Sequence, residues 1–236
     1  MDNIPKLKLT AIVPYYNELE TLEATIHSIL KLELGIDLEI IAVDDGSTDG
    51  SSFNISPEEE TAVKLLNHPT NKGKGAAIRT ALEHVTGDIV VIQDADMEYN
   101  PEEWINLIPY FKDGSEQVVY GSRFMGNIKA MTFKSKIANL TLTRLTNLLF
   151  RSKLTDMETC MKMFKYDLIK SLKLESNDFR IEPELTSIFL KKEIHIKEVP
   201  INYTARSLLK GKKIKPKDGF LAIVALFKFR FKKLSS

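Results

Sequence analysis

The chain contains very little cysteine. Its 236 residues include one, Cys160, which lies between Thr159 and Met161. A single thiol cannot form a disulfide within the chain, so the core alone must hold the fold, and the protein suits a reducing compartment. We expect Cys160 to be a small core residue rather than a nucleophile.

Long apolar runs are also missing. The longest one, Phe220 to Phe227, falls far short of the ~20 residues that a membrane-spanning helix needs. The first residues, MDNIPKLKLTAIV, do not place a basic segment before an apolar one, so no signal peptide is predicted. We therefore expect a cytoplasmic protein that is either soluble or attached to a membrane surface.

A strong net charge is absent too. The 33 Lys and Arg residues and 32 Asp and Glu residues give a net charge of +1, which does not predict a nucleic-acid partner. The charge is uneven, however, and the asymmetry predicts an anionic partner at the C-terminal end. After Arg206 one acid, Asp218, stands against these cations: Lys210, Lys212, Lys213, Lys215, Lys217, Lys228, Arg230, Lys232 and Lys233.

What is present is an alternation of apolar runs and amphipathic segments, with 43% hydrophobic residues overall. This alternation predicts an α/β fold with a doubly wound, mostly parallel sheet flanked by helices. In the first half the expected strands are 8–13, 38–43, 62–67, 88–93 and 118–120. The expected helices are 17–32, capped by Asn17 with Leu19 in its buried stripe, 75–85, and one that starts at Asn100.

The second half has a less regular pattern. Its expected helices are 134–150, with Ile137 and Leu148 among its apolar residues, 182–191 and 218–234, and its expected strands are 161–164 and 195–203. With no internal repeat or linker, we expect one domain over residues 1–236. Within it, residues 1–124 form the regular half, residues 125–217 the variable half, and residues 218–236 would form a basic amphipathic helix.

Three carboxylates follow the predicted strand 88–93: Asp94, Asp96 and Glu98. In an extended segment alternate side chains share a face, so the three anions would lie together and repel one another unless a cation joins them. Oxygen ligands suit Mg²⁺ or Mn²⁺ better than zinc. A solvated turn is the alternative interpretation.

Two other strand ends carry similar residues. The first strand is followed by Pro14 to Glu18, and the second by Asp44, Asp45, Gly46 and Ser47. In open α/β sheets, ligands bind beyond the carboxyl ends of the strands, so the coincidence of three such ends favours a ligand site. A Gly-Ser turn with local side-chain bonds is the alternative for Asp44 and Asp45.

Several common motifs are missing. The segment Asn71 to Gly75 lacks the spacing of a phosphate-binding P-loop, and no G-x-G-x-x-G follows the first strand, which disfavours ATPases and dehydrogenases. The alternative for Asn71 to Gly75 is a solvated start of a helix. The four histidines lie in separate elements without zinc-ligand spacing.

Five motifs in their order and spacing resemble family 2 glycosyltransferases, and most closely the dolichyl-phosphate mannose synthase-like branch. The resemblance covers roughly Leu9 to Arg206. The motifs are Val13-Pro14-Tyr15-Tyr16-Asn17-Glu18, Val43-Asp44-Asp45-Gly46-Ser47-Thr48-Asp49-Gly50, Asn71-Lys72-Gly73-Lys74-Gly75, Asp94-Ala95-Asp96 and Gly121-Ser122-Arg123-Phe124.

The resemblance implies a GT-A-type domain that binds a GDP- or UDP-hexose. Residues 1–124 would be its nucleotide-sugar-binding half, and residues 125–217 would face the acceptor. The residues that would hold the nucleoside are Pro14, Tyr16, Glu18, Asp44 and Asp45. Asp94, Ala95 and Asp96 would form the D-x-D motif that positions ribose, diphosphate and Mg²⁺ or Mn²⁺. Glu98, where relatives often have glutamine, would be a further metal ligand.

The acceptor leaves alternatives open. A hydroxyl acceptor would need a general base, for which the candidates are Asp156, Glu158, Glu182 and Glu184. A polyprenyl phosphate is already ionised and needs cations instead, and by resemblance Arg123 and Arg206 would contact the phosphates.

We therefore expect inverting, metal-dependent transfer of a hexose to a polyprenyl phosphate, as in a mannosyltransferase of this branch. A soluble enzyme acting on a glycan or small-molecule hydroxyl is the alternative, and a non-catalytic nucleotide-sugar-binding module is a second. The last helix, with Phe220, Ile223, Phe227 and Phe231, would either contact the membrane peripherally or pack on the domain.

Overall fold

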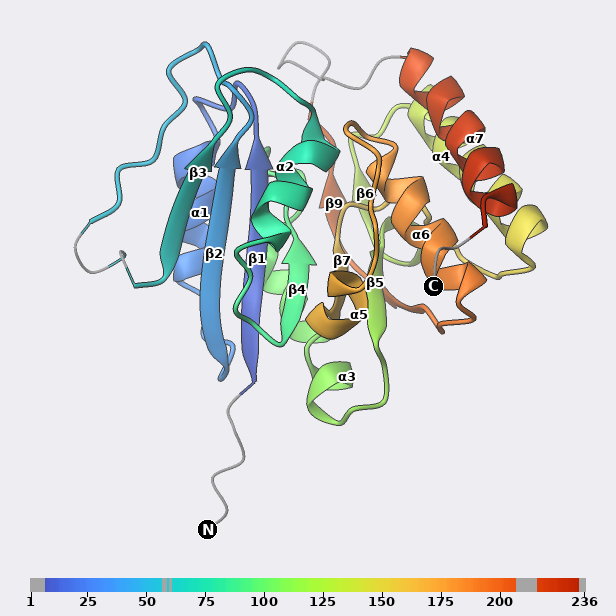
Figure 1. Cartoon of the computed structure of the whole chain (residues 1–236), viewed down its shortest axis with the longest axis horizontal. Coiled ribbons are helices and arrows are strands. Elements are labelled where there is room, and N and C mark those ends of the chain that lie inside the picture. Colours follow the sequence, from blue (N-terminus) through green and yellow to red (C-terminus); the bar gives the residue numbers. More distant parts are fainter. Residues whose placement is uncertain (1–6, 57–58, 60, 207–215, 234–236) are drawn as a thin grey trace.

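The structure is a computed structural model that describes residues 7–56, 59, 61–206 and 216–233. Lys210, Lys212, Lys213 and Lys215 of the basic C-terminal segment lie outside these residues. A seven-stranded sheet forms the centre of the described chain, in the order β3-β2-β1-β4-β7-β5-β8, and β6 pairs with β9 in a second, small sheet (Figure 1). The strands are β1 (Lys8–Tyr15), β2 (Asp37–Asp44), β3 (Val63–Asn67), β4 (Ile89–Ile92), β5 (Val118–Ser122), β6 (Ile128–Lys129), β7 (Lys162–Lys165), β8 (Lys197–Pro200) and β9 (Tyr203–Thr204).

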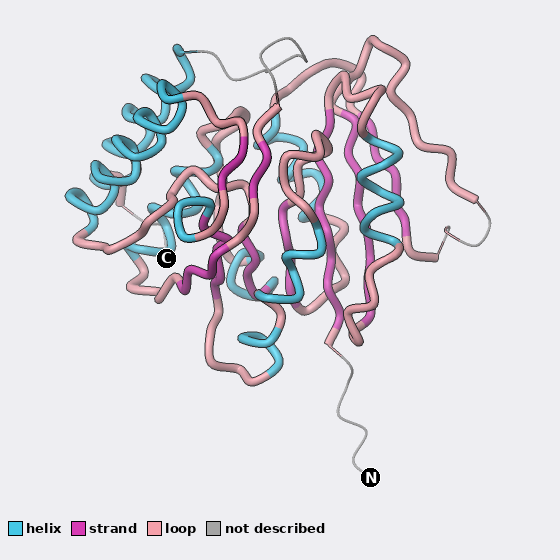
Figure 2. Tube along the Cα trace, turned by 180° about the vertical axis from the view of Figure 1, so that it is seen from behind, coloured by secondary structure: helices cyan, strands magenta, loops and turns pink. Residues whose placement is uncertain are grey.

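Helices cover both faces of the large sheet, so the predicted α/β class is confirmed. Figures 1 and 2 show α1 and α2 on opposite faces. The α-helices are α1 (Leu22–Leu30), α2 (Lys74–Leu82), α3 (Pro109–Lys112), α4 (Phe133–Phe150), α5 (Tyr166–Lys170), α6 (Ile181–Lys191) and α7 (Pro216–Phe231), and the 3-10 helices are η1 (Pro101–Asn106) and η2 (Arg123–Met125).

Strand β1 lies at the centre of the parallel part of the sheet. Every residue from Leu9 to Tyr15 is buried, as expected of a strand with parallel neighbours on both sides and helices on both faces. The register places Tyr15 beside Asp44. The loops after β1 and β2 therefore start next to each other, as the sequence predicts.

Strand β7 breaks the parallel pattern. It runs antiparallel to both neighbours, β4 and β5. Because β7 lies beside β4, the predicted acceptor-side part of the chain shares one sheet with the predicted nucleotide-binding part. Side chains from β7 and from the loop before it can therefore reach the end of β4.

Two predicted elements differ from the structure. The first helix begins at Leu22 instead of residue 17, because Asn17 has a φ of 51° and turns the chain away from a helix. Leu19, expected in the buried stripe, is exposed. The predicted strand 195–203 is split into β8 and β9, and β9 joins β6 instead of the large sheet.

A layer of three helices, α4, α6 and α7, lies at one end of the sheet (Figures 1 and 2). Helix α7 packs on the other two through Ala222, Ala225, Leu226 and Phe229, which are buried. Of the expected apolar residues, Ile223 is partly buried against α4, whereas Ile137 and Leu148 of α4 are exposed.

The other face of α7 carries an exposed apolar stripe. Its members follow the spacing i, i+4, i+7 and i+11 of one helix face, with exposed fractions of 67% for Phe220, 45% for Val224, 43% for Phe227 and 76% for Phe231. In the described part of the chain, no helix combines the length and apolar character needed to cross a bilayer.

Candidate active site

Hydrogen bonds tie the loops after β1 and β2 together. The Asn17 N–H donates to Ser47 Oγ (2.9 Å), and the Thr48 N–H donates to Asn17 Oδ1 (2.8 Å). Asp44 Oδ1 accepts from the Ser47 N–H (2.8 Å), which closes a local turn. Asp44 therefore has the turn role that we considered as the alternative. It is half-buried and remains partly accessible at the end of β2.

Asp45 faces the interior, unlike its neighbour. Its carboxylate contacts His68 Nδ1 (2.7 Å) and accepts from the N–H groups of Lys72 (2.9 Å) and Gly73 (2.7 Å). These bonds fix the Asn71 to Gly75 segment at the start of α2. The structure thus places Asp45 as a support for that segment, and direct contact of Asp45 with a nucleoside stays a prediction.

The other residues predicted to bind the nucleotide sugar differ in exposure. Pro14 and Ala95 are buried, and Tyr16 is half-buried. Ala95 offers its backbone carbonyl to Thr25 Oγ1 (3.2 Å). Glu18 is buried and accepts from Arg206 Nη1 (3.0 Å). Strands β1 and β4 pair in parallel, so the residues that follow them lie at neighbouring strand ends.

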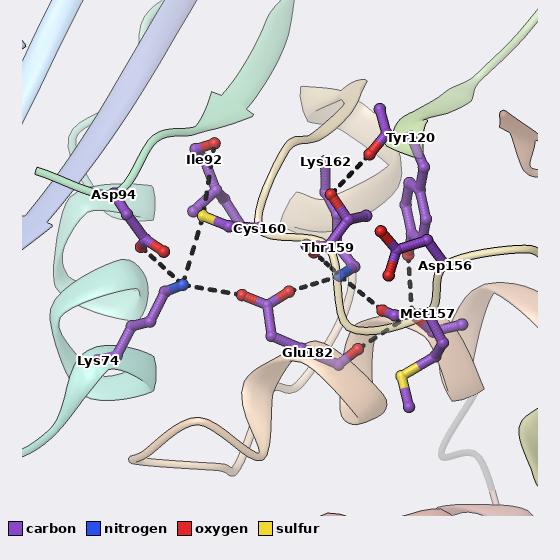
Figure 3. A network of polar contacts seen from close by, with 12 residues as sticks. Lys74, Ile92, Asp94, Tyr120, Asp156, Met157, Thr159, Cys160, Lys162 and Glu182 are labelled. Atoms are coloured by element: carbon purple, nitrogen blue, oxygen red, sulfur yellow. Dashed lines mark hydrogen bonds and ion pairs between the residues drawn. The ribbon is translucent and has the colours of Figure 1, made fainter. Parts of the chain in front are cut away.

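Lys74, the first residue of α2, is the nearest cation to the predicted D-x-D motif. Its Nζ lies 2.7 Å from Asp94 Oδ1, 3.0 Å from Glu182 Oε1 and 3.4 Å from Cys160 Sγ (Figure 3). Burial alone would lower the pKa of Lys74, but the charges of Asp94, Cys160 and Glu182 raise it well above its usual value. Burial alone would raise the pKa of Asp94, but the charge and hydrogen bond of Lys74 outweigh burial, so the pKa of Asp94 is lowered. Both groups are therefore charged near neutral pH.

The charge network continues from Glu182 into β7. Glu182 Oε2 accepts from Lys162 Nζ (2.6 Å), and Lys162 also donates to the carbonyls of Met157 (3.0 Å) and Thr159. Lys162 is fully buried. Asp94, Lys74, Glu182 and Lys162 thus alternate in sign across α2, α6 and the ends of β4 and β7 (Figure 3).

The sequence reasoning assigned no role to Lys74 or Lys162. The glycines around Lys74 were the available signal: Gly73 has a φ of 99°, and its N–H must approach Asp45. For Lys162 the sequence gives only a lysine at the start of a short apolar strand. Its partner Glu182 lies twenty residues further along the chain, beyond the reach of any local pattern.

Arg206 gathers the remaining carboxylates. Its guanidinium contacts Glu18 (3.0 Å from Nη1), Asp96 (2.9 Å from Nη2) and Glu98 (3.5 Å from Nε). Glu98 also accepts from the Arg206 N–H (2.9 Å) and from the Tyr203 hydroxyl. Burial, together with the charges of Asp94 and Glu98, raises the pKa of Asp96 to about 7, and Arg206 opposes that rise. The cluster is therefore rich in negative charge even with Arg206 in place.

Arg123 lies apart from this cluster in a buried ion pair. Its Nε and Nη2 each lie 2.7 Å from an oxygen of Asp156, and its backbone N–H donates to the same carboxylate (3.0 Å). Arg123 also donates to Asn139 Oδ1, and the rings of Tyr203 and Phe124 lie near its guanidinium. The structure thus gives Arg123 a structural partner, and its predicted contact with a phosphate stays a prediction.

The four candidate bases differ in their engagement. Asp156 is paired with Arg123, and Glu182 lies between two lysines. Glu184 accepts from two backbone N–H groups, those of Glu175 (2.8 Å) and Ser176 (2.7 Å). Glu158 is different, because its Oε1 is buried without a hydrogen-bond partner and burial raises its pKa to about 7. Of the four, Glu158 has the carboxylate most available to take a proton.

The donor set at the end of β4 fits a divalent metal ion that arrives with a diphosphate. Among the residues that the structure describes, no three Asp, Glu, His or Cys side chains form a group able to hold a metal by themselves. Asp94 and Asp96 nevertheless present hard oxygen donors, and burial together with the charges of Asp94 and Glu98 raises the pKa of Asp96. Mg²⁺ is commonly bound by one or two carboxylates plus substrate phosphates. Glu98 is held by Tyr203 and Arg206, so its part as a ligand stays a prediction.

Comparisons with known sequences agree with the motifs. A family model described as glycosyl transferase family 2 matches residues 10–173. The chain is 28% identical over 219 residues to a dolichol-phosphate mannosyltransferase of Pyrococcus furiosus, covering 88% of this chain and 61% of the relative. It is also 28% identical over 221 residues to an uncharacterized protein of Methanocaldococcus jannaschii, covering 89% and 88%. The chain thus spans less than two thirds of the length of the Pyrococcus relative.

Solved structures show the same fold. Glucosyl-3-phosphoglycerate synthase of Mycobacterium tuberculosis matches with a TM-score of 0.70 and 20% identity, covering 95% of this chain and 81% of that chain. A crystal structure of that enzyme in complex with Mn²⁺, uridine diphosphate and phosphoglyceric acid matches with a TM-score of 0.68 and 19% identity, covering 98% and 81%. The predicted GT-A-type architecture is therefore confirmed.

Proposed function

Because the chain belongs to glycosyl transferase family 2, a family of nucleotide-sugar-dependent enzymes, we propose that it transfers a hexose from a nucleotide-diphosphate sugar to a polyprenyl phosphate. One observation carries this proposal. Beyond the end of β4, the carboxylates Asp94 and Asp96 lie in contact with the cations Lys74 and Arg206. This combination suits a reaction whose leaving group and nucleophile are both phosphates.

The donor would bind along the ends of β1, β2 and β4. Asp94 and Asp96 would hold Mg²⁺ or Mn²⁺, and the bound ion would neutralise the charge that develops on the leaving diphosphate. Pro14, Tyr16 and Asp44 border the place for the nucleoside of a GDP- or UDP-sugar. Asp45 acts indirectly, since it holds the segment that presents Lys74.

The engaged carboxylates favour a phosphate acceptor. A phosphate oxygen is already ionised and attacks the anomeric carbon directly, so the bond to the diphosphate oxygen breaks and the configuration inverts. No general base is needed, which agrees with Asp156, Glu182 and Glu184 being occupied by cations or N–H groups. The name of the Pyrococcus relative, a dolichol-phosphate mannosyltransferase, supports the same acceptor class. A hydroxyl acceptor is the second candidate, and it rests on Glu158, whose Oε1 is buried without a hydrogen-bond partner.

An acceptor comparison tests this proposal. Purified protein is given GDP-mannose or UDP-glucose with Mn²⁺, and either dolichyl phosphate or a glycan acceptor. We expect product with dolichyl phosphate, loss of product when EDTA removes the metal, and loss in Asp96→Asn. Asp167→Asn, an exposed carboxylate on α5, is the matched control and should retain activity. Product with the glycan alone would contradict the acceptor, and donor binding without any turnover would favour a binding module.

A polyprenyl acceptor also requires contact with a membrane, for which α7 is the proposed element. It packs on the domain with one face and exposes Phe220, Val224, Phe227 and Phe231 on the other. Exposed Lys217 and Lys233 add positive charge near the two ends of this helix. Aromatic side chains with flanking cations are typical of helices that lie in the interface of an anionic bilayer. We therefore propose that the protein associates peripherally with the membrane, at its cytoplasmic face.

Vesicle sedimentation tests the membrane contact without any donor or acceptor. The chain should sediment with phosphatidylglycerol vesicles, and Phe220→Ser combined with Phe227→Ser should weaken this binding. Ile105→Ser is the control, because Ile105 is an exposed apolar residue on η1. Equal sedimentation of the double variant and the wild type would show that α7 is not the contact.

A further inference from the structure

Two protein cations occupy the carboxylates at the end of β4, and they are held in different ways. Lys74 contacts Asp94 and Arg206 contacts Asp96, at 2.7 Å and 2.9 Å. The two aspartates are the proposed metal ligands. A divalent ion at these oxygens would therefore meet one protein cation on each side.

Lys74 is fixed from behind. It belongs to α2, its side chain is largely buried, and Glu182 holds its Nζ at 3.0 Å (Figure 3). Glu182 is in turn fixed by the buried Lys162 at 2.6 Å. Withdrawing Lys74 from Asp94 would disturb a buried set of alternating charges, which is costly when partners are left unpaired.

Arg206 has no such support among the described residues. Within the described part of the chain, its guanidinium pairs with carboxylates of the cluster, namely Glu18, Asp96 and Glu98. Its Nε is buried without a hydrogen-bond partner. Arg206 lies just after the two-residue strand β9, outside any helix or strand. Its backbone N–H is held by Glu98, whereas its side chain is held by the negative charge that it neutralises.

These contacts lead to a rule for how the site exchanges cations. We propose that Arg206 is a placeholder that neutralises Asp96 in the metal-free protein and leaves it when a divalent ion binds, whereas Lys74 stays on Asp94. The inference rests on the proposed role of Asp94 and Asp96 as metal ligands. A divalent ion repels both cations, but Glu182 holds Lys74 in place, so the guanidinium of Arg206 is the cation that gives way at Asp96.

The exchange of Arg206 for a metal ion would couple the binding of the metal to the binding of the nucleotide. A metal ion alone must displace Arg206 and leave the guanidinium without its partner. A diphosphate that arrives with the metal brings anionic oxygens that suit the released guanidinium. Arg206 therefore makes the free metal bind weakly, and it favours joint binding of the metal and the nucleotide.

Titration with Mn²⁺ alone, followed by the EPR signal of free Mn²⁺, measures this competition without any transfer reaction. Arg206→Met should bind Mn²⁺ about tenfold more tightly than the wild type, because it removes a competing charged hydrogen bond. Arg206→Lys keeps the charge but loses the planar guanidinium, so its affinity for Mn²⁺ should fall between those of the wild type and Arg206→Met. Arg180→Met is the control for net charge, because Arg180 pairs with Asp178 and not with Asp96, and it should match the wild type.

The outcomes separate this inference from the proposed function. Equal or weaker Mn²⁺ binding by Arg206→Met would overturn the placeholder role, as would the same gain in Arg180→Met. Asp96→Asn tests the underlying assignment, since it should reduce Mn²⁺ binding both in the wild type and in the Arg206→Met background. If Asp96→Asn has no effect on Mn²⁺ binding, the metal site of the proposed function has failed. If Asp96→Asn weakens binding but Arg206→Met does not tighten it, only the exchange has failed.

Discussion

Replacing Asp156 by Asn should destabilise the protein strongly, because Asp156 is the buried partner of Arg123. The Asp156 carboxylate receives three hydrogen bonds from Arg123, two from the guanidinium and one from the backbone, at 2.7, 2.7 and 3.0 Å. Both side chains are almost completely buried. An Asn amide at this place would turn a donor towards the donors of Arg123 and would leave the guanidinium charge uncompensated.

The chain supplies a matched pair at the surface. Arg180 and Asp178 have the same three bonds at 2.7, 2.8 and 3.0 Å, but their side chains are 39% and 38% exposed. Breaking a buried pair from one side costs about 3–5 kcal/mol. An exposed pair is worth about 0.2–1 kcal/mol, because water replaces the lost partner. Asp156→Asn should thus cost several times more than Asp178→Asn, although the bond lengths are nearly equal.

Urea unfolding measures both losses in the same way. The chain has one tryptophan, Trp104, which is buried, so its fluorescence reports unfolding, and far-UV circular dichroism gives an independent signal. Equal losses for the two variants, or a loss below about 1 kcal/mol for Asp156→Asn, would refute the argument that burial decides the weight of the pair. Removing both charges with Arg123→Met and Asp156→Leu should recover part of the loss, because no lone charge stays buried.

Three further predictions concern groups elsewhere in the fold. Glu182→Gln should lower the free energy of unfolding by about 3–5 kcal/mol, because Lys74 and Lys162 lose the carboxylate between them, and urea titration would show it. The raised pKa of Glu158, about 7, means that its contribution to stability is complete below its unfolded value of 4.5 and is lost as pH rises through 7. The melting temperature should therefore fall less steeply between pH 5 and pH 8 in Glu158→Gln than in the wild type. Parallel curves of melting temperature against pH would contradict this. Gly46→Ala should lower the melting temperature, since its φ is 76° and a Cβ would lie 2.6 Å from the backbone of the neighbouring loop.

Much of the fold follows from local patterns in the sequence. Apolar runs separated by amphipathic segments predict the strands and helices of the first half, and Asn100 caps η1 through the Glu102 N–H as its type and position suggest. The first helix is the exception. Asn17 and Glu20 have the spacing of a capping box, but the backbone of Asn17 is left-handed and its side chain bonds across to the loop after β2. A contact between two loops overrides the local signal there.

The candidate site was also predicted only in part. Strand ends that carry ligand-type residues can be found from sequence, and the parallel sheet brings them to one edge. Adjacent residues such as Asp44 and Asp45 point to opposite sides of a strand end, and the sequence does not tell which one faces the core. The structure answers that Asp45 is buried against His68 and the start of α2.

By itself the sequence determined the α/β class, the family resemblance and the position of the D-x-D motif, because each depends on residue type and local spacing. Only the tertiary structure decided which charges meet. Strand β7 enters between β4 and β5 in the opposite direction and brings Lys162 to Glu182, while the segment after β9 brings Arg206 to Glu18 across 188 positions of the chain. Such pairs depend on burial and on the path of the whole backbone, which is why no local pattern in the sequence predicts them.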